Sequence, residues 1–261
     1  MTIGFLYIAT GKYMYFWKDF FLSCEKFFIP EARKHYFIFT DDTTMRSDDN
    51  ITIIPRQCAG FPADSLFRFE MFLSIRELLQ KQDYVFFLNA NMQIVDAVGE
   101  EILPTAENGF LVGVLHPAEA RKRPPWSFPY ERSPRSLAYI PPNDPPYNYF
   151  TGAINGGRTP EFLAMSQLLA DNIRKDYDKG IIARFHDESH LNRFFHSHHP
   201  LTMDCRYCAP EGWDVIQNPK IMMRDKVKVS EYFRKQRDGL VPHMLKGARC
   251  VFDGIRWYLH V

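Results

Sequence analysis

Two asparagines stand directly after a short apolar run, where polar side chains could bind a ligand. The run from Tyr84 to Leu88 is typical of a buried strand in an α/β sheet, and Asn89-Ala90-Asn91 follows it. Carboxylates at such a strand end could hold a divalent cation, but amides are neutral and bind a hard cation far more weakly. The tripeptide is therefore a binding site that works without metal, a site that has lost its chemistry, or an ordinary turn of the kind that Asn favours.

Histidine and cysteine pairs offer a second, weaker kind of site. His186 and His190 are spaced to share one helical face, as zinc-ligating pairs do, but Asp187 stands where the zinc-protease pattern has glutamate. Cys205 and Cys208 form one CxxC pair, and a structural zinc site would need a second pair that the chain lacks. A metal-dependent hydrolase built on the histidines is thus an alternative that the pattern does not favour.

Two charged residues, Arg68 and Glu188, are candidates for a functional site. Arg68 is flanked by Phe67 and Phe69, and a buried arginine needs an anion, either an internal acid or a bound one. Glu188 falls in the helix-like segment 186–196, where, judged from that segment alone, it reads as a surface residue.

The composition is that of an ordinary globular protein, and it excludes few functional classes. It has 261 residues, 46% hydrophobic and 24% charged, with a net charge of +1, so no global field selects nucleic acid or a membrane. Five widely spaced cysteines do not suggest a disulfide framework. The apolar stretch Ile3 to Ala9 is too short for a signal peptide or a membrane span. We therefore expect a cytoplasmic protein without a transmembrane segment and without a nucleic-acid partner.

The elements that must position these residues alternate between strands and helices. The expected strands are 3–9, 35–39, 51–54, 84–88, 92–95, 109–115 and 149–157, and the expected helices are 15–28, 64–82 (with Asp64 as N-cap), 160–177 and 186–196. This alternation predicts an α/β fold with a mostly parallel sheet wrapped by helices. Ligands of such sheets sit beyond the carboxyl ends of the strands, where Thr10, Thr40 and Asn89 fall.

Two further segments differ from the rest. Residues 116–147 are crowded with prolines, which cannot feed a central sheet, but they also carry aromatic side chains that can pack. We expect an ordered wall of an active site there. Residues 240–261 look unrelated to what precedes them and are interpreted as a tail derived from a cloning vector.

Several separated motifs together resemble glycosyltransferase family 6, the retaining enzymes that include the ABO blood-group transferases and the α1,3-galactosyltransferases. They run in family order over residues 3 to about 220: Ala9-Thr-Gly-Lys-Tyr13, Phe37-Ile-Phe-Thr-Asp41, Arg68-Phe-Glu-Met71, Tyr84 to Met92, Leu115-His-Pro117, Phe128-Pro-Tyr-Glu-Arg132, Ala138-Tyr-Ile-Pro141, Tyr149 to Gly157 and His186-Asp-Glu-Ser-His-Leu-Asn192.

The resemblance implies a GT-A fold with a Rossmann-like mixed sheet, in one catalytic domain over residues 1–239. Its donor half would span about 1–115 and its acceptor half about 116–239. Because the chain opens directly at this domain, it looks like a soluble bacterial-type member. The implied reaction is transfer of a sugar from a UDP-sugar, in α1,3 linkage, to a galactose of an acceptor glycan.

The main departure from the family is Asn89-Ala90-Asn91 in place of the metal-binding Asp-x-Asp. We therefore expect no divalent metal cofactor. Basic side chains would then have to offset the diphosphate charge, with Lys12, Arg68 and the basic segment from Arg224 onward as candidates. A catalytically dead module that binds a UDP-sugar or a glycan is the alternative that the lost acids suggest.

The family motifs also imply residue roles. Glu188 matches the essential glutamate beneath the anomeric carbon, as nucleophile or as stabiliser of an oxocarbenium-like centre. The implied donor-binding residues are Ile8, Ala9, Thr10, Tyr13, Arg68, Asn89, Ala90, Asn91, Thr151, Gly152, Ala153, Asp187, Lys226 and Lys228. The implied acceptor-binding residues are His116, Pro129, Phe185, Trp213 and Asp214.

Thr151 lies where the family selects its donor, and its small side chain leaves room for an acetamido group. This favours UDP-N-acetylgalactosamine over UDP-galactose. Asp214 could bond a fucose hydroxyl, so a fucosylated galactoside such as 2′-fucosyllactose is the expected acceptor. For each acceptor-side residue, ordinary packing or surface exposure is the alternative.

Overall fold

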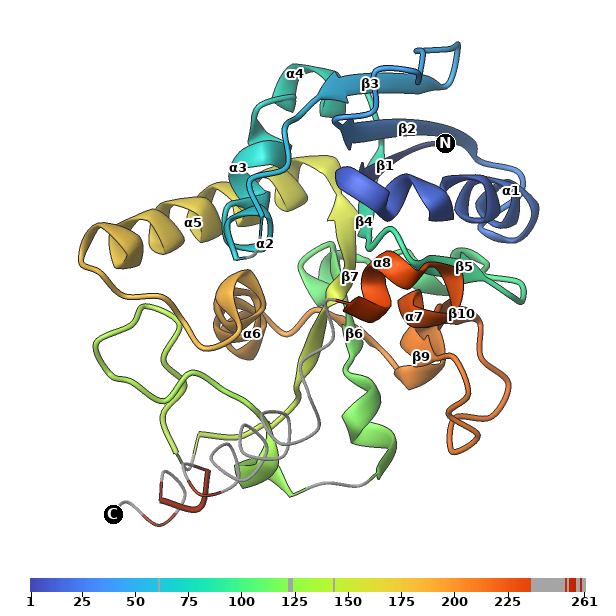
Figure 1. The fold of residues 1–261 in the computed structure, drawn as a ribbon. Helices are drawn as coiled ribbons and strands as arrows, with labels where there is room; N and C mark the ends of the chain where they lie inside the picture. Colours follow the sequence, from blue (N-terminus) through green and yellow to red (C-terminus); the bar gives the residue numbers. More distant parts are fainter. Residues whose placement is uncertain are drawn as a thin grey trace.

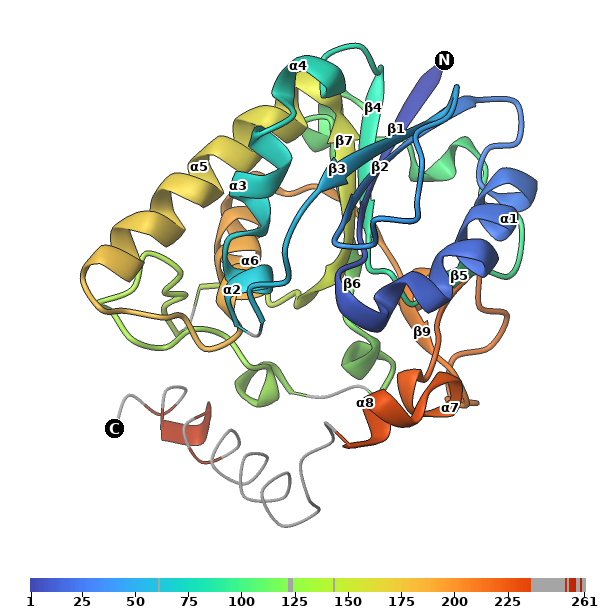
Figure 2. The same ribbon diagram turned by 45° about the horizontal axis from the view of Figure 1, so that its top comes forward.

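A mixed sheet of seven strands forms the centre of the molecule, with helices on both faces (Figures 1 and 2). The computed structural model describes residues 1–235 apart from 61, 122–123 and 143, together with residues 252, 254–256 and 259. In spatial order the strands are β3 (Ile51–Pro55), β2 (Arg33–Thr40), β1 (Thr2–Ile8), β4 (Tyr84–Leu88), β7 (Phe150–Arg158), β6 (Leu111–Leu115) and β8 (Leu201–Met203). The expected α/β class is confirmed.

The direction of β7 decides where the site can form. Strands β1 to β4 pair in parallel, whereas β7 runs antiparallel to both β4 and β6. The beginning of β7 therefore lies at the same edge of the sheet as the carboxyl end of β4, with Leu88 opposite Ile154. This edge is where α/β sheets place their ligands.

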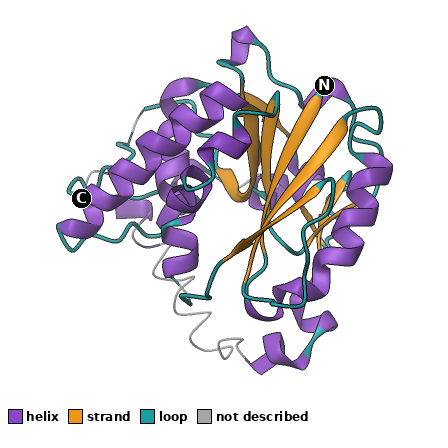
Figure 3. Ribbon diagram, turned by 90° about the horizontal axis from the view of Figure 1, so that it is seen from above, coloured by secondary structure: helices purple, strands orange, loops and turns teal. Residues whose placement is uncertain are grey.

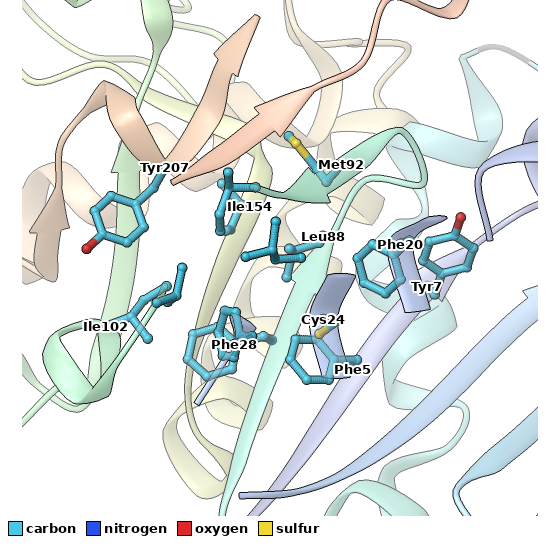
Figure 4. Close-up of a cluster of buried hydrophobic side chains, with 14 of the residues drawn as sticks. Phe5, Tyr7, Phe20, Cys24, Phe28, Leu88, Met92, Ile102, Ile154 and Tyr207 are labelled. Atoms are coloured by element: carbon cyan, nitrogen blue, oxygen red, sulfur yellow. The ribbon is translucent and has the colours of Figure 1, made fainter. Parts of the chain in front are cut away.

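Each face of the sheet is covered by its own helices, as the view from above shows (Figure 3). Helix α1 (Trp17–Phe27) packs on one face, and α3 (Arg68–Leu73), α5 (Thr159–Asp178) and α6 (His186–His198) pack on the other. Figure 4 shows Phe20 and Cys24 of α1 lying against Phe5 and Leu88 of the sheet. Burial of these apolar side chains is the main driving force that holds the layers together.

The prediction of one continuous helix over 64–82 is wrong. Three short helices replace it, namely α2 (Ala63–Leu66), α3 and α4 (Arg76–Leu79). The backbone leaves the helical region at Phe67 and Ile75, and between them the Ser74 hydroxyl donates to the Met71 carbonyl at 2.6 Å. Such a local bond competes with the helical ladder.

Asp64 is not the N-cap that the sequence suggested. Pro62 holds the cap position of α2, and the Asp64 carboxylate instead accepts the backbone N–H groups of Ala59 and Gly60, at 3.1 and 3.0 Å. The acid therefore closes the preceding loop rather than the helix. The other expected helices and strands are present with ends shifted by a few residues.

The proline-rich segment packs as an ordered wall in the residues that the structure describes. Phe128, Tyr130 and Ile140 form a small core with Tyr149, which immediately precedes β7. Two short 3₁₀ turns interrupt it, η4 (Pro117–Arg121) and η5 (Pro125–Ser127). The aromatic residues of this segment thus pack against the site edge of the sheet.

A second, small sheet lies beside this edge (Figure 1). Its strands are β5 (Met92–Ile94), β10 (Ile221–Met223) and β9 (Ala209–Pro210), and two short helices follow, α7 (Lys226–Val229) and α8 (Glu231–Lys235). The expected vector-derived tail, 240–261, lies mostly outside the described residues. No described helix is both long and apolar enough to cross a bilayer.

Candidate active site

Glu188 lies at the sheet edge with both carboxylate oxygens held. The Tyr149 hydroxyl donates to Oε1 and the Gly152 N–H donates to Oε2, each at 2.6 Å. Burial raises the pKa of Glu188, while these two hydrogen bonds and the nearby Arg68 lower it. The carboxylate is thereby fixed in direction, and the surface-residue interpretation of Glu188 is wrong.

The approach between Glu188 and the sheet needs glycine at position 152. A β-carbon there would stand 3.0 Å from the Glu188 Cβ and 3.2 Å from its Oε2. On the helix side, His186 begins α6 with a φ of +52°, a backbone region that residues other than glycine rarely adopt. Strain of this kind, about 1–3 kcal/mol, concentrates at functional sites.

Asn192 links helix α6 to strand β7. Its side chain accepts the Phe150 N–H at 2.8 Å and donates to the Phe150 carbonyl at 2.8 Å and to the Glu188 carbonyl at 2.9 Å. Because Asn192 is one helical turn after Glu188, it sets the height of that residue above β7. The family motif contains this asparagine, but its role was not inferred from the sequence.

Arg68 and Asp187 form a buried ion pair behind the site. The Arg68 guanidinium also donates to the Gly152 carbonyl at 2.7 Å and covers the Phe87 ring at 4.3 Å. Burial raises the pKa of Asp187 to about 6, although Arg68 opposes that rise. The anionic partner that Arg68 requires is thus an internal acid, so its charge is already balanced within the protein.

A cavity of about 450 Å³ lies against the second sheet, and Asn91, after the carboxyl end of β4, contributes to its lining. Tyr13, Asn91, Trp213, Arg224 and Lys226 are among the residues that line it. The Lys226 ammonium donates to the Tyr13 hydroxyl at 2.9 Å. The cavity therefore joins four of the expected ligand-binding residues, Tyr13, Asn91, Trp213 and Lys226, and adds Arg224.

The two strand-end asparagines have different surroundings. Asn91 is buried, and its amide nitrogen donates to the Arg224 carbonyl at 2.8 Å. Asn89 is half-buried and its backbone N–H donates to the Ala153 carbonyl. Neither side chain supplies a charged oxygen, and one amide is already committed as a donor. This donor set does not fit the divalent cation of the family's Asp-x-Asp site.

The other donor-side residues also gather at this edge. Ala90 is buried and its carbonyl accepts the Tyr7 hydroxyl at 3.0 Å, while the Thr151 hydroxyl accepts the Ala153 N–H at 3.1 Å. Ala9 already donates its N–H to the Phe39 carbonyl. Ile8 ends β1 beside it, and the Thr10 carbonyl accepts the Tyr13 N–H. The Lys228 ammonium, by contrast, pairs with Glu211 at 3.1 Å.

The expected acceptor residues divide into two groups. His116 and the half-buried Pro129 adjoin Tyr149 and its aromatic cluster, and Phe185, 42% exposed, directly precedes α6. Trp213 lines the neighbouring cavity, and Asp214 beside it is exposed. His116 thus contacts Tyr149, which holds Glu188, and Trp213 shares the cavity with Arg224 and Lys226.

The histidine pair shows no zinc-site arrangement. His190 is buried with its Nε2 3.7 Å from an Asp176 oxygen, and burial lowers its pKa to about 4. Among the residues that the structure describes, no three His, Cys, Asp or Glu side chains are grouped to hold a metal ion.

Besides Asn192, two further positioning residues were missed by the sequence analysis. Tyr149 holds Glu188, and Glu131 links the proline-rich wall to the segment before α6 by accepting the Arg184 N–H at 2.7 Å. Both lie inside the quoted motifs. Tyr149 shares a strand face with Thr151 by the two-residue period, which is the one local signal that pointed to it.

Comparison with known proteins agrees with this geometry. The family model of glycosyltransferase family 6 matches residues 1–237. The chain is 35% identical to the O-antigen biosynthesis glycosyltransferase WbnI of Escherichia coli over 234 residues, which cover 89% of this chain and 98% of that protein.

Two vertebrate relatives match over a smaller part of their own length. The globoside α-1,3-N-acetylgalactosaminyltransferase 1 of Gallus gallus is 33% identical over 82% of this chain and 62% of its own length. The histo-blood group ABO system transferase 1 of Rattus norvegicus is 32% identical over 85% of this chain and 64% of its own length.

The mixed sheet, its flanking helices and the ligand edge with a fixed carboxylate define a glycosyltransferase with a GT-A-like fold. The chain belongs to glycosyltransferase family 6.

Proposed function

We propose that this protein is a retaining, metal-independent α1,3-glycosyltransferase that moves N-acetylgalactosamine from UDP to the galactose of a fucosylated acceptor. The observation that carries the proposal is the Glu188 carboxylate, whose two oxygens are held by Tyr149 and Gly152 at the start of β7. A retaining transfer needs such a group on the face of the sugar opposite the leaving diphosphate, to attack or to stabilise the anomeric centre.

Lys226 is the cation we assign to the diphosphate. Arg224 and Lys228 both face Glu211, at 3.6 and 3.1 Å, whereas Lys226 contacts the neutral Tyr13 hydroxyl. Of these three cations, Lys226 is therefore the one whose charge is not offset by an acid among the described contacts. A lysine supplies the point charge that a metal ion would otherwise place there.

The donor choice rests on the small Thr151 side chain at the start of β7. It is buried, with Cys208 4.0 Å from its hydroxyl. A bulkier residue here would reduce the room for an acetamido group, so N-acetylgalactosamine is preferred to galactose. The name of the Gallus gallus relative carries the same donor sugar and linkage.

The test is transfer from UDP-N-acetylgalactosamine and from UDP-galactose to 2′-fucosyllactose, in EDTA and with manganese. We expect transfer in EDTA that falls at least about a hundredfold in Glu188→Gln, because a group that stabilises the transition state is lost. Glu107→Gln serves as the matched control, since Glu107 is exposed and remote from the cavity. UDP affinity, measured by calorimetry, should be retained in both variants.

Other outcomes would each change the assignment. Activity that needs manganese would contradict metal independence and require ligands other than Asn89 and Asn91. UDP binding without transfer to any fucosylated galactoside would favour the binding-module alternative. The cytoplasmic location expected from cysteine usage is part of the same proposal, tested by cell fractionation.

A further inference from the structure

The buried Asn91 side chain connects the end of the central strand to the basic segment that follows β10. Its amide nitrogen donates to the Arg224 carbonyl, and the Arg224 N–H donates back to the Asn91 carbonyl, both at 2.8 Å. These bonds continue the antiparallel ladder in which Met92 faces Met223. Residues that are 133 positions apart in the chain are thereby joined at one point.

The segment that begins at this point carries the positive charge of the cavity. Arg224 reaches Asp19 at 3.2 Å and Glu211 at 3.6 Å, and Asp225 caps α7 by accepting the Val227 N–H. Lys226 follows directly and reaches Tyr13. The position of Lys226 therefore depends on where the chain leaves Arg224.

An amide can make this connection and a carboxylate of the same shape cannot. The Arg224 carbonyl is an acceptor, so its partner must carry a hydrogen, which the Asn91 amide does and an ionised aspartate does not. An aspartate would place acceptor against acceptor in a buried position and leave the carbonyl unsatisfied.

We propose that Asn91 is a positioning residue that fixes the Arg224–Lys228 segment, so that Lys226 stands at the diphosphate site. The inference rests on the proposed function. It gives the strand-end amide a positioning role, so the amide is more than the remnant of a lost metal ligand. A carboxylate would recruit a metal cation to the diphosphate, whereas this amide brings a cationic side chain.

The experiment compares Asn91→Ala and Asn91→Asp with Asn89→Asp. The Asn89 variant adds the same negative charge two residues away, and no hydrogen bond of the Asn89 side chain is present among the described contacts. Hydrogen exchange of residues 221–229 is measured by mass spectrometry, and the affinities for UDP and for uridine are measured in EDTA at two salt concentrations.

We expect exchange in 221–229 to rise in both Asn91 variants and to stay unchanged in Asn89→Asp. UDP affinity should fall about tenfold in Asn91→Ala, the order expected when a buried hydrogen bond is lost and its acceptor is left unpaired. Uridine affinity should change less than about twofold, and the salt dependence of UDP binding should weaken because fewer cations face the phosphates.

Three results would overturn the inference. Unchanged exchange in 221–229 would show that Asn91 does not hold the segment. Equal losses for UDP and uridine would show general support of the cavity without a link to the diphosphate. If the wild-type protein bound UDP no more tightly than uridine, Lys226 would have no role in binding the diphosphate. By contrast, UDP binding that behaves as expected without any sugar transfer would contradict the proposed function alone.

Discussion

At the scale of single residues, the site is defined by how Glu188 is held. A half-buried carboxylate with a hydrogen-bond donor on each oxygen has little freedom to rotate, so its direction is fixed before a substrate arrives. Preorganised groups of this kind contribute to catalysis without reorganising during the reaction. The two donors also set the pH range in which the carboxylate is ionised.

Tyr149→Phe should move the acid limb of the pH profile upward. Burial raises the pKa of Glu188 and the Tyr149 hydroxyl lowers it, so removing the hydroxyl raises it further. If the ionised form is active, activity is lost as pH falls through this pKa, and the loss then begins at higher pH.

The measurement is kcat/KM against pH for wild type and variant. Phenylalanine keeps the ring that stacks on Phe128 at 5.9 Å, so the fold should be retained, which a thermal melt can verify. A variant with reduced activity but an unmoved acid limb would contradict the role of Tyr149 in tuning Glu188.

Arg68→Leu should destabilise the protein by about 3–5 kcal/mol, because it leaves the Asp187 charge buried without a partner. The double variant Arg68→Leu, Asp187→Leu should recover much of this loss, since neither charge then remains. The free energy of unfolding in urea measures both. Equal stabilities of the single and double variants would mean that the pair is not the source of the cost.

At the scale of elements, one acid joins the proline-rich wall to the catalytic helix. Glu131 is buried and accepts the N–H groups of Ser133 and Arg184, at 2.8 and 2.7 Å. Arg184 directly precedes Phe185, the expected acceptor platform, and α6 begins at His186. The wall and the helix that carries Glu188 therefore have a shared anchor.

Glu131→Ala should raise the KM for the acceptor about tenfold, because losing the Glu131 carboxylate removes its hydrogen bond to the Arg184 N–H and loosens the segment around Phe185. UDP affinity should be unaffected, since the basic segment is held elsewhere. Glu131→Gln keeps one carbonyl oxygen as acceptor and should show a smaller effect. A matching fall in UDP affinity would indicate a general loss of folding instead.

At the scale of the whole molecule, the ligand cavity is built between the two sheets. Phe233 of α8 packs on Tyr13 at 5.0 Å and on Phe16 at 6.0 Å, so α8 contacts the segment that follows β1 (Figure 1). A nucleotide bound in the cavity would contact both sheets at once. Its binding free energy then stabilises the whole arrangement.

UDP should therefore raise the melting temperature equally in EDTA and in manganese. At a free concentration about a hundred times Kd, one site contributes about 2.7 kcal/mol. This corresponds to a shift of about 5–10 °C for a domain of this size. Thermal melts with UDP and with uridine provide the measurement, and a shift that appears only with manganese would contradict metal independence.

The sequence by itself determined the class of fold and the identity of the central carboxylate. Apolar runs such as 84–88 bury as strands whatever surrounds them, and the motif around Glu188 placed it in a family. The broken helix over 64–82 escaped this reasoning, because Phe67 and Ser74 fit a helical pattern and only the packed backbone shows the interruptions.

Only the tertiary structure decided which partners meet. Tyr149 and Glu188 are 39 residues apart, Arg68 and Gly152 are 84 apart, and Asn91 and Arg224 are 133 apart. No local period encodes such contacts, because they arise where the antiparallel β7 and the second sheet bring distant segments to one edge. The same Asn-Ala-Asn sequence could end a strand as a simple turn, and it becomes an anchor only because the Arg224 carbonyl is placed where the Asn91 amide can donate to it.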